Sequence, residues 1–174
     1  MAKEEPCLIA KLDALEFEIE TEYSDLGDFI FKLPRFLESE EELESIKLDS
    51  YFPIGKDDLT DHLRKLRYES EFKKINHSFP LNIANANLFL ATSFFEGWLL
   101  RLAKEFEESL KLDFSSTRGT GFQKLIRFFK NASIDLDSFN RIEQVYIAMK
   151  IRNCMIHTHG LMSYSRDDKE IRPC

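Results

Sequence analysis

Glycine, proline and cysteine are all scarce in this sequence of 174 residues, which contains 6 Gly, 5 Pro and 3 Cys. So few Gly and Pro argue against a β-sandwich and against a protein rich in flexible linkers. Cys7, Cys154 and Cys174 lie far apart and form no Cys-x-x-Cys pair. Because disulfide frameworks use even numbers of cysteines and zinc sites use closely spaced pairs, the sequence predicts neither of them.

Long hydrophobic runs are also missing, since no uncharged apolar stretch reaches the roughly 18 residues of a membrane-spanning helix. The first residues, MAKEEPCLIAKLD, are acidic and lack the apolar segment of a signal peptide. We therefore expect a cytoplasmic protein that does not enter a membrane. Apolar residues nevertheless make up 43% of the chain and aromatic residues 13%, with 16 Phe. That is enough material for a hydrophobic core in a protein of this length.

Positive charge is scarce in the first third of the chain. Residues 1–60 carry 6 basic and 17 acidic side chains, a balance of −11, whereas residues 61–174 carry 18 basic and 14 acidic side chains, a balance of +4. The overall charge of −7 argues against strong nonspecific binding of nucleic acid, which needs a basic surface. The later residues leave room for a local basic site, because the segment SSTRGTGFQKLIRFFKNAS contains four basic side chains and no acid.

Apolar residues recur at intervals of three and four along most of the chain, which is the spacing of amphipathic helices. The segment from 24 to 55 is interrupted by two Gly and two Pro, so we predict short helical pieces and loops there. Pro80 is expected to end one helix or to begin the next. The pattern predicts helices over residues 5–23, 59–79, 81–112 and 122–130, and a last helix from Asp137 or Ser138 to Gly160.

No segment has the alternating pattern of a strand, and no internal repeat is present. The sequence therefore predicts an all-α protein. We expect one compact domain overall, in which an acidic N-terminal helical extension (1–80) packs on a helical bundle core (81–174).

The last predicted helix contains an unusual group of polar residues, Arg152, Asn153 and His157, close to its C-terminal end. At about 100° per residue, Asn153 falls in the middle of an apolar stripe, and the other two fall on its edges. The opposite side of the helix is also apolar. A helix with two apolar sides needs two surfaces to pack against, so we expect the bundle interior on one side and a second copy of the protein on the other.

The polar group has two interpretations on spacing alone. Buried polar side chains without partners cost about 1–3 kcal/mol each, so these three either satisfy one another and their neighbours or line a wet cleft. In the structural interpretation, Asn153 and His157 bond to a neighbouring helix and Arg152 pairs with a carboxylate. In the chemical interpretation, the imidazole transfers protons and the guanidinium binds phosphate oxygens, a combination that suits phosphodiester cleavage.

At these residues the sequence resembles the HEPN superfamily. Domains of that family are all-α, are built on a four-helix bundle, and carry an Arg, four to six residues and a His on the last core helix. Arg152 and His157 match the four-residue spacing, Asn153 matches the polar residue that often follows the Arg, and HTHG is similar to a His-x-x-Gly ending. The resemblance covers roughly residues 81–160. It implies a four-helix-bundle core of HEPN type, with the residues before it as extra N-terminal helices.

The resemblance further implies a bacterial endoribonuclease with a toxin or phage-defence role. Two motif helices would face each other in a homodimer and cleave RNA without a metal or cofactor, by attack of the 2′-hydroxyl on the adjacent phosphorus. Arg152 and His157 would be catalytic, and Asn153 would orient the His or contact the second copy. An antitoxin or another partner protein would accompany such an enzyme. The alternative is a noncatalytic HEPN-type module for dimerisation or for binding RNA or nucleotides.

Several other residues are candidates for supporting roles. Members of the family often carry an acidic or polar residue near the Arg, which makes Glu96 a candidate partner of Arg152; a solvated carboxylate is the alternative. The basic segment supplies Arg118, Lys124 and Arg127 as candidate contacts with the RNA backbone. No spacing of His, Cys, Asp and Glu matches a metal site, so we predict no bound metal.

Overall fold

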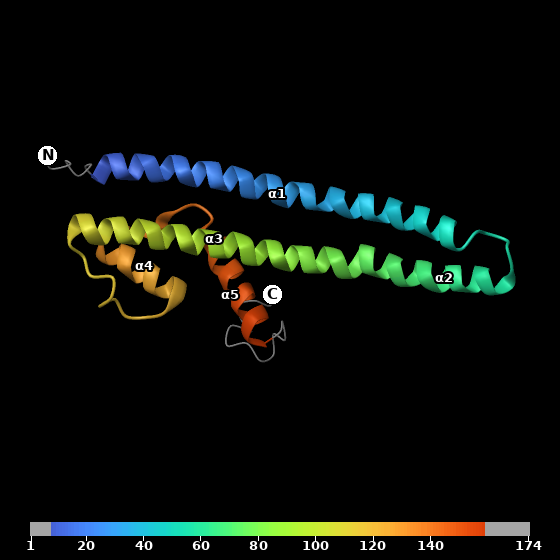
Figure 1. The fold of residues 1–174 in the computed structure, drawn as a ribbon. Coiled ribbons are helices and arrows are strands. Elements are labelled where there is room, and N and C mark those ends of the chain that lie inside the picture. Colours follow the sequence, from blue (N-terminus) through green and yellow to red (C-terminus); the bar gives the residue numbers. More distant parts are fainter. Residues whose placement is uncertain (1–7, 159–174) are drawn as a thin grey trace. The chain divides into compact units, whose positions relative to one another are not determined.

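The computed structural model describes residues 8–158, which form helices joined by turns and loops, with no strand among them (Figure 1). The predicted all-α class is therefore confirmed. No described helix combines the length and the apolar composition that crossing a membrane requires. In chain order the elements are α1 (Leu8–Tyr51), α2 (Asp58–Lys73), the π-helical turn η1 (Lys74–Ser78), α3 (Phe79–Leu110), α4 (Gly121–Asn131), the 3-10 turn η2 (Leu136–Ser138) and α5 (Ile142–Thr158).

The described residues divide into two compact units. The first, here named the packed unit, consists of residues 8–22 and 88–158, and the second, named the hairpin unit, consists of residues 23–87. Helices α1 and α3 each contribute residues to both units.

Helix α1 differs from the prediction, because it continues through Gly27 and Pro34 as far as Tyr51. The prediction of short pieces and loops is therefore wrong up to that residue. Relative to alanine, a glycine inside a helix costs about 1 kcal/mol and a proline about 3 kcal/mol. An apolar stripe runs along the same stretch, and its members Leu26 and Leu48 are buried. The other apolar residues of the stripe are only half-buried. This partial burial along one face of α1 contributes to offsetting the cost of the two helix breakers.

A turn joins α1 to α2 within the hairpin unit, where the sequence predicts a break. Gly55 lies in this turn with a φ of 73°, a left-handed conformation that favours glycine. Arg64 of α2 donates a hydrogen bond to the backbone oxygen of Phe52 at 2.8 Å and pairs with Asp49 at 2.6 Å. These polar contacts hold the ends of the two helices together.

Pro80 lies at the beginning of α3, yet no loop separates α3 from α2. The π-helical turn Lys74–Ser78 joins the two helices directly. A proline inside a regular helix removes one hydrogen bond and crowds the carbonyl four residues earlier. The wider π-helical turn immediately before Pro80 accommodates both effects, which is why the helical path is not interrupted.

The packed unit is organised around a cluster of buried side chains from α3, α4 and α5. Helix α4 contributes most of them, because one of its faces is almost entirely aromatic or aliphatic. The rings of Phe114 and Phe128 meet edge to face with their centroids 5.2 Å apart. The buried members of the cluster are Leu99, Ala103, Phe122, Leu125, Phe128, Phe129 and Met149.

Residues 8–22 of α1 join the packed unit through polar contacts with α3. Arg101 pairs with Glu18 at 2.7 Å, and the indole Nε1 of Trp98 donates to Glu22 at 3.1 Å. The guanidinium of Arg101 also lies over the Trp98 ring, 4.1 Å from its centroid. Trp98 is only 4% exposed, so this contact is anchored on a buried ring.

Helix α5 begins later than predicted. Asp137 and Ser138 belong to the 3-10 turn η2, which Asp135 caps by accepting a backbone hydrogen bond. Arg141 then takes a left-handed conformation with a φ of 64°, and α5 starts only at Ile142. The prediction that Asp137 or Ser138 caps the last helix is therefore wrong, because neither residue is adjacent to that helix.

Candidate functional site

The polar residues of α5 line a hollow of about 390 Å³ within the packed unit, which we name the motif hollow. Helix α3 contributes one residue to its wall, the start of α4 contributes a short stretch, and α5 contributes the rest. The lining residues are Glu96, Thr120, Gly121, Phe122, Gln123, Tyr146, Met149, Lys150, Arg152, Asn153 and His157. Arg152, Asn153, His157 and Glu96, which the sequence placed in one site, therefore share one hollow.

The guanidinium of Arg152 pairs with the carboxylate of Glu96. Arg152 Nη1 lies 2.7 Å from Glu96 Oε2, and the two side chains are 22% and 17% exposed. The same nitrogen lies 3.7 Å from the Met149 sulfur. The expected partnership of these residues is thus present in the structure. It holds the guanidinium at the wall of the motif hollow with its charge partly balanced.

One nitrogen of Arg152 is left without an acceptor. Its Nε is buried and makes no hydrogen bond with any described residue. An unsatisfied buried donor costs about 1–3 kcal/mol, and such groups are uncommon in native proteins. The guanidinium is therefore not fully satisfied by residues 8–158. A rotation toward the motif hollow would let an acceptor in the hollow supply the missing bond.

Asn153 and His157 are exposed, and neither side chain makes a hydrogen bond with the described residues. They lie one turn apart on α5, at the edge of the motif hollow. The structural interpretation of the polar group therefore fits Arg152, which pairs with a carboxylate. It does not fit Asn153 and His157, which make no hydrogen bond with a described neighbouring helix. Within the part of the chain that the structure describes, both of those groups are exposed at the edge of the motif hollow.

Tyr146 also lines the motif hollow, one turn and a half before Arg152. Its hydroxyl donates to Asp137 Oδ1 at 2.6 Å. Partial burial, together with this hydrogen bond to a carboxylate, raises the pKa of Tyr146 to about 12. The phenol therefore stays protonated at neutral pH, so it offers a neutral hydroxyl to the site and not a base.

Gly121 brings the first turn of α4 close to the ion pair. It has a φ of 52°, and a side-chain carbon added there would lie 3.4 Å from Glu96 Oε1. Glycine is favoured at this position because the conformation is left-handed, whereas the added carbon would make only an ordinary contact with the carboxylate. The contact of Gly121 with Glu96 joins α4 to α3, so it is visible only in the tertiary structure.

Helix α5 buries apolar residues on both of its sides and also keeps other apolar residues exposed. Ile142 and Met149 are buried, and so is Cys154 on the opposite side. Ile147 and Ile156 are 46% and 45% exposed. Two apolar sides were predicted, and the structure leaves part of each uncovered.

The basic residues of the predicted RNA-contacting segment lie outside the motif hollow. The Lys124 side chain packs against the preceding loop. Its Nζ lies 4.5 Å from the centre of the Phe114 ring and 3.5 Å from the backbone oxygen of Ser115. Arg118 and Arg127 line a separate hollow at the other end of α4. Lys124 thus supports the preceding loop, whereas the two arginines present their guanidiniums at the surface.

The motif hollow includes three residues that were not identified as site residues from the sequence: Tyr146, Gly121 and Gln123. Gly121 and Gln123 follow a loop in the chain, so no helical spacing connects them with α5. Tyr146 does fall near His157 in angle along α5, and this spacing is the signal that could have identified it. His159 and Gly160 lie outside the described residues.

Within residues 8–158, no three His, Cys, Asp or Glu side chains come together as a set that could ligate a metal ion. Comparison of the chain with protein-family models, with curated proteins and with solved structures finds no match.

Proposed function

We propose that this protein is a metal-independent endoribonuclease of the HEPN type, acting as a cytoplasmic homodimer. The observation that carries the proposal is the motif hollow, in which a guanidinium paired with Glu96 and an exposed imidazole lie on one helix. A toxin or phage-defence role, with an antitoxin or another partner protein, accompanies this proposal through the family resemblance.

The proposed reaction is transfer of a phosphodiester within the RNA strand. The 2′-hydroxyl oxygen forms a bond to the adjacent phosphorus while the bond from phosphorus to the 5′-oxygen breaks. His157 takes the proton from the attacking hydroxyl or gives one to the leaving oxygen. Arg152 binds the phosphate oxygens, where negative charge increases in the transition state. The products are a 2′,3′-cyclic phosphate and a 5′-hydroxyl end.

A second copy completes the proposed site. One motif hollow holds a single Arg and a single His, whereas simultaneous removal and delivery of protons needs two groups. The exposed Ile147 and Ile156 give α5 an apolar surface for a twofold contact. Pairing two copies of α5 would bring both sets of Arg152, Asn153 and His157 to one shared opening.

Cleavage of mixed cellular RNA in the presence of EDTA tests this proposal. We expect the wild-type protein to cut RNA and to leave cyclic phosphate ends, because no step uses a metal. His157→Ala should abolish cutting. Since His157 is exposed and unbonded, the variant should keep the wild-type melting temperature and oligomeric state.

His62→Ala is the matched control, because His62 is an exposed histidine on α2, in the hairpin unit. It should cut like wild type. Failure of the wild-type protein to cut any RNA, or full activity of His157→Ala, would contradict the proposal.

A noncatalytic module for dimerisation or RNA binding is the second candidate. Two observations favour it: Arg152 already has a carboxylate partner, and residues 1–60 carry a charge balance of −11 that repels RNA. In that case His157→Ala should dissociate or destabilise the dimer, and the wild-type protein should cut nothing. The same set of measurements therefore separates the two functions.

A further inference from the structure

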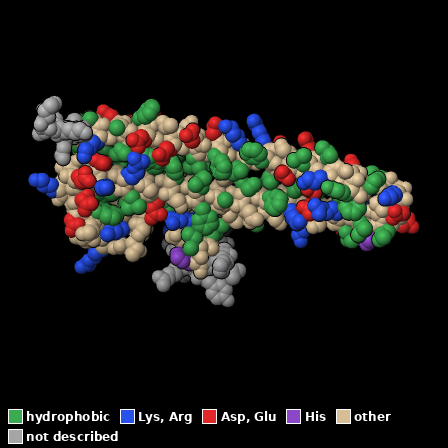
Figure 2. All heavy atoms as spheres, viewed as in Figure 1, with side chains coloured by type: hydrophobic (Ala, Val, Ile, Leu, Met, Phe, Trp, Pro, Cys, Tyr) green, Lys and Arg blue, Asp and Glu red, His purple; other side chains and the backbone are tan. Residues whose placement is uncertain are grey.

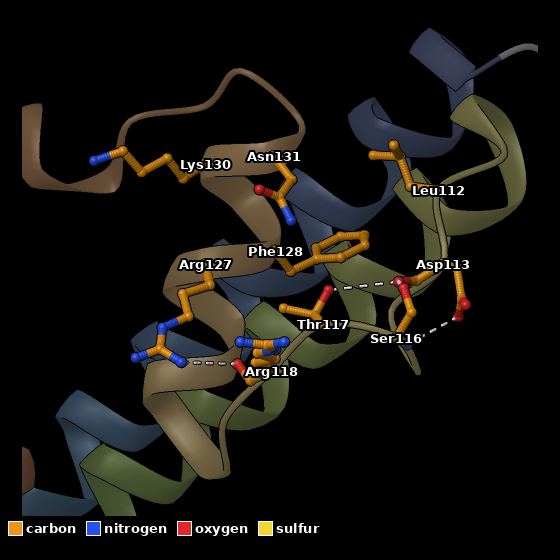
Figure 3. Close-up of a pocket in the computed structure, with 9 residues that line it drawn as sticks. All are labelled: Leu112, Asp113, Ser116, Thr117, Arg118, Arg127, Phe128, Lys130 and Asn131. Carbon is orange, nitrogen blue, oxygen red and sulfur yellow. Dashed lines mark hydrogen bonds between the residues drawn. The ribbon is translucent and has the colours of Figure 1, made fainter.

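A second hollow, of about 590 Å³, lies at the C-terminal end of α4 and is named here the basic hollow. The loop after α3 forms one side of it and α4 forms the other, as Figure 3 shows. Leu112 and Phe128 make its apolar floor. The remaining lining residues are polar or charged: Asp113, Ser116, Thr117, Arg118, Arg127, Lys130 and Asn131.

Most cations of the basic hollow have no acidic partner. Arg118 and Lys130 are exposed and make no ion pair with the described residues. Arg127 donates one hydrogen bond, from Nη1 to the backbone oxygen of Arg118 at 3.2 Å (Figure 3), which leaves most of its donors available. The stretch 114–134 contains four basic residues and no acid. The positive charge at this hollow is therefore not balanced locally.

Asp113 is the one acid in the lining, and its carboxylate is occupied by its own loop. Its Oδ1 accepts hydrogen bonds from the hydroxyl and backbone nitrogen of Ser115 and from the backbone of Ser116. The Ser115 hydroxyl bond, followed by those from the backbone, lowers the pKa of Asp113. This acid shapes the loop, and it does not pair with Arg118 or Arg127.

The loop geometry keeps the two arginines next to each other. Gly119 has a φ of 114°, and a side-chain carbon added there would lie 3.4 Å from Arg127 Nη1. The left-handed conformation favours glycine at this position, and the loop backbone passes beside Arg127 here. The backbone carbonyl of Arg118 accepts the bond from Arg127, and both arginines line the basic hollow.

Helix α4 connects the basic hollow to the motif hollow. Gln123 lines the motif hollow, whereas Arg127 and Lys130 line the basic hollow. These three residues are spaced by four and three positions, so they share one exposed face of α4. Four residues correspond to about 6 Å along the helix axis. A chain of polar groups therefore runs along the surface of α4 from one hollow to the other.

We propose that the basic hollow binds the backbone phosphates of the RNA strand that flanks the scissile phosphate. This inference rests on the proposed function for the identity of the ligand. Arg118 and Arg127 bind phosphate oxygens, Lys130 contributes from the rim, and the strand follows α4 toward the motif hollow. Because these contacts are the same before and during the reaction, they contribute to binding and not to the chemical step.

RNA affinity measured without cleavage tests the inference. The full-length His157→Ala protein is titrated into a fluorescently labelled single-stranded oligoribonucleotide at several salt concentrations. Adding Arg118→Ala or Lys130→Ala should weaken binding several-fold. Each removed phosphate contact should also flatten the plot of log affinity against log salt by about 0.7. Both side chains are exposed, so the variants should fold like the parent.

Lys104→Ala is the matched control, because Lys104 is an exposed cation on α3 that lines neither hollow. It removes the same charge and should leave affinity and salt dependence nearly unchanged. In the cleaving protein, Arg118→Ala should raise KM and leave kcat unchanged. A mononucleotide should bind much more weakly than the strand, and its affinity should not depend on Arg118.

The outcomes separate this inference from the proposed function. If the wild type cuts RNA but Arg118→Ala and Lys130→Ala bind as the parent does, the inference is wrong and the nuclease proposal stands. If the wild type cuts nothing while RNA binding still depends on both residues, the inference holds and the nuclease proposal fails. Equal losses in Lys104→Ala, equal affinity for the mononucleotide, or no RNA binding at all would also overturn the inference.

Discussion

The packed unit and the hairpin unit contain similar helices but use their apolar residues in opposite ways. In the packed unit, α4 alone buries Phe122, Leu125, Phe128 and Phe129. In the hairpin unit the buried apolar residues are Leu26, Leu48 and Ile75, while many larger side chains stay at the surface, some of them visible in Figure 2. The most exposed are Phe31, Ile54 and Tyr51, at 81%, 77% and 74%.

The difference shows that apolar composition does not by itself produce a core. Hydrophobic stabilisation scales with the apolar area removed from water, at about 25 cal/mol per Å². Two adjacent helices can bury only the faces that meet, whereas three helices and a loop can enclose a common interior. We therefore expect the packed unit to hold most of the conformational stability. The polar residues of the motif hollow then lie on the more rigid of the two units.

The largest expected effect comes from removing a core ring of the packed unit. Phe128 is 1% exposed, so Phe128→Ala should lower the free energy of unfolding by about 3–5 kcal/mol through lost contacts and the cavity that remains. Urea unfolding followed by fluorescence measures this loss. Trp98, the single tryptophan of the chain, lies in the packed unit and reports on it directly.

Phe31→Ala is the corresponding change in the hairpin unit, where the ring is 81% exposed. It should change the free energy of unfolding by no more than about 0.5 kcal/mol. Similar losses for the two variants would show that the contrast between the units is wrong.

Replacing one glycine by alanine in each unit should change the free energy of unfolding by smaller amounts, with opposite signs in the two units. Gly121→Ala should destabilise the packed unit by about 1–2 kcal/mol, because φ is positive there. Under the proposed function it should also reduce RNA cleavage, because relief of the left-handed strain would shift the backbone that lines the motif hollow. Thermal unfolding and the cleavage assay measure the two effects.

Gly27→Ala is the control, because Gly27 lies within α1 and nothing stands within 4 Å of the added carbon. There alanine should stabilise the helix by about 0.5–1 kcal/mol. Stabilisation by Gly121→Ala would contradict the left-handed conformation of this residue.

The smallest expected effect appears only at alkaline pH. The pKa of Tyr146 is raised from 10.0 to about 12 in the folded protein, so the phenol contributes stability that is fully present below pH 10. That contribution is lost as the pH rises from 10 toward 12. Tyrosinate absorbance during an alkaline titration, with circular dichroism to monitor folding, should show a late component that Tyr146→Phe removes.

Asp137→Asn sharpens this measurement, because it replaces the carboxylate that accepts the phenol hydrogen bond. The late component should then move to lower pH. Burial also raises the pKa of Tyr23. A late component whose amplitude is unchanged in Tyr146→Phe would therefore contradict the assignment to Tyr146.

Much of the fold was predictable because helical periodicity is a local property. The amphipathic pattern of FQKLIRFFK predicted α4 within one residue at each end, and the long apolar stripe predicted α3 within two residues. Local rules failed where distant contacts outweighed them. Pro34 interrupts the pattern of α1 but not the helix, because the face that carries Leu26 and Leu48 packs within the hairpin unit and these two residues are buried. The start of α5 was wrong because the left-handed Arg141 has no signature in sequence.

The sequence by itself determined the all-helical class and the grouping of Arg152, Asn153 and His157, because the rise and rotation of one helix fix how residues a few positions apart are arranged. Only the tertiary structure decided which groups surround them. Glu96 lies 56 positions before Arg152, yet it pairs with its guanidinium, and Gly121 comes from a third helix. Such contacts depend on how separate helices pack, and packing is set by the shapes of all the side chains between them.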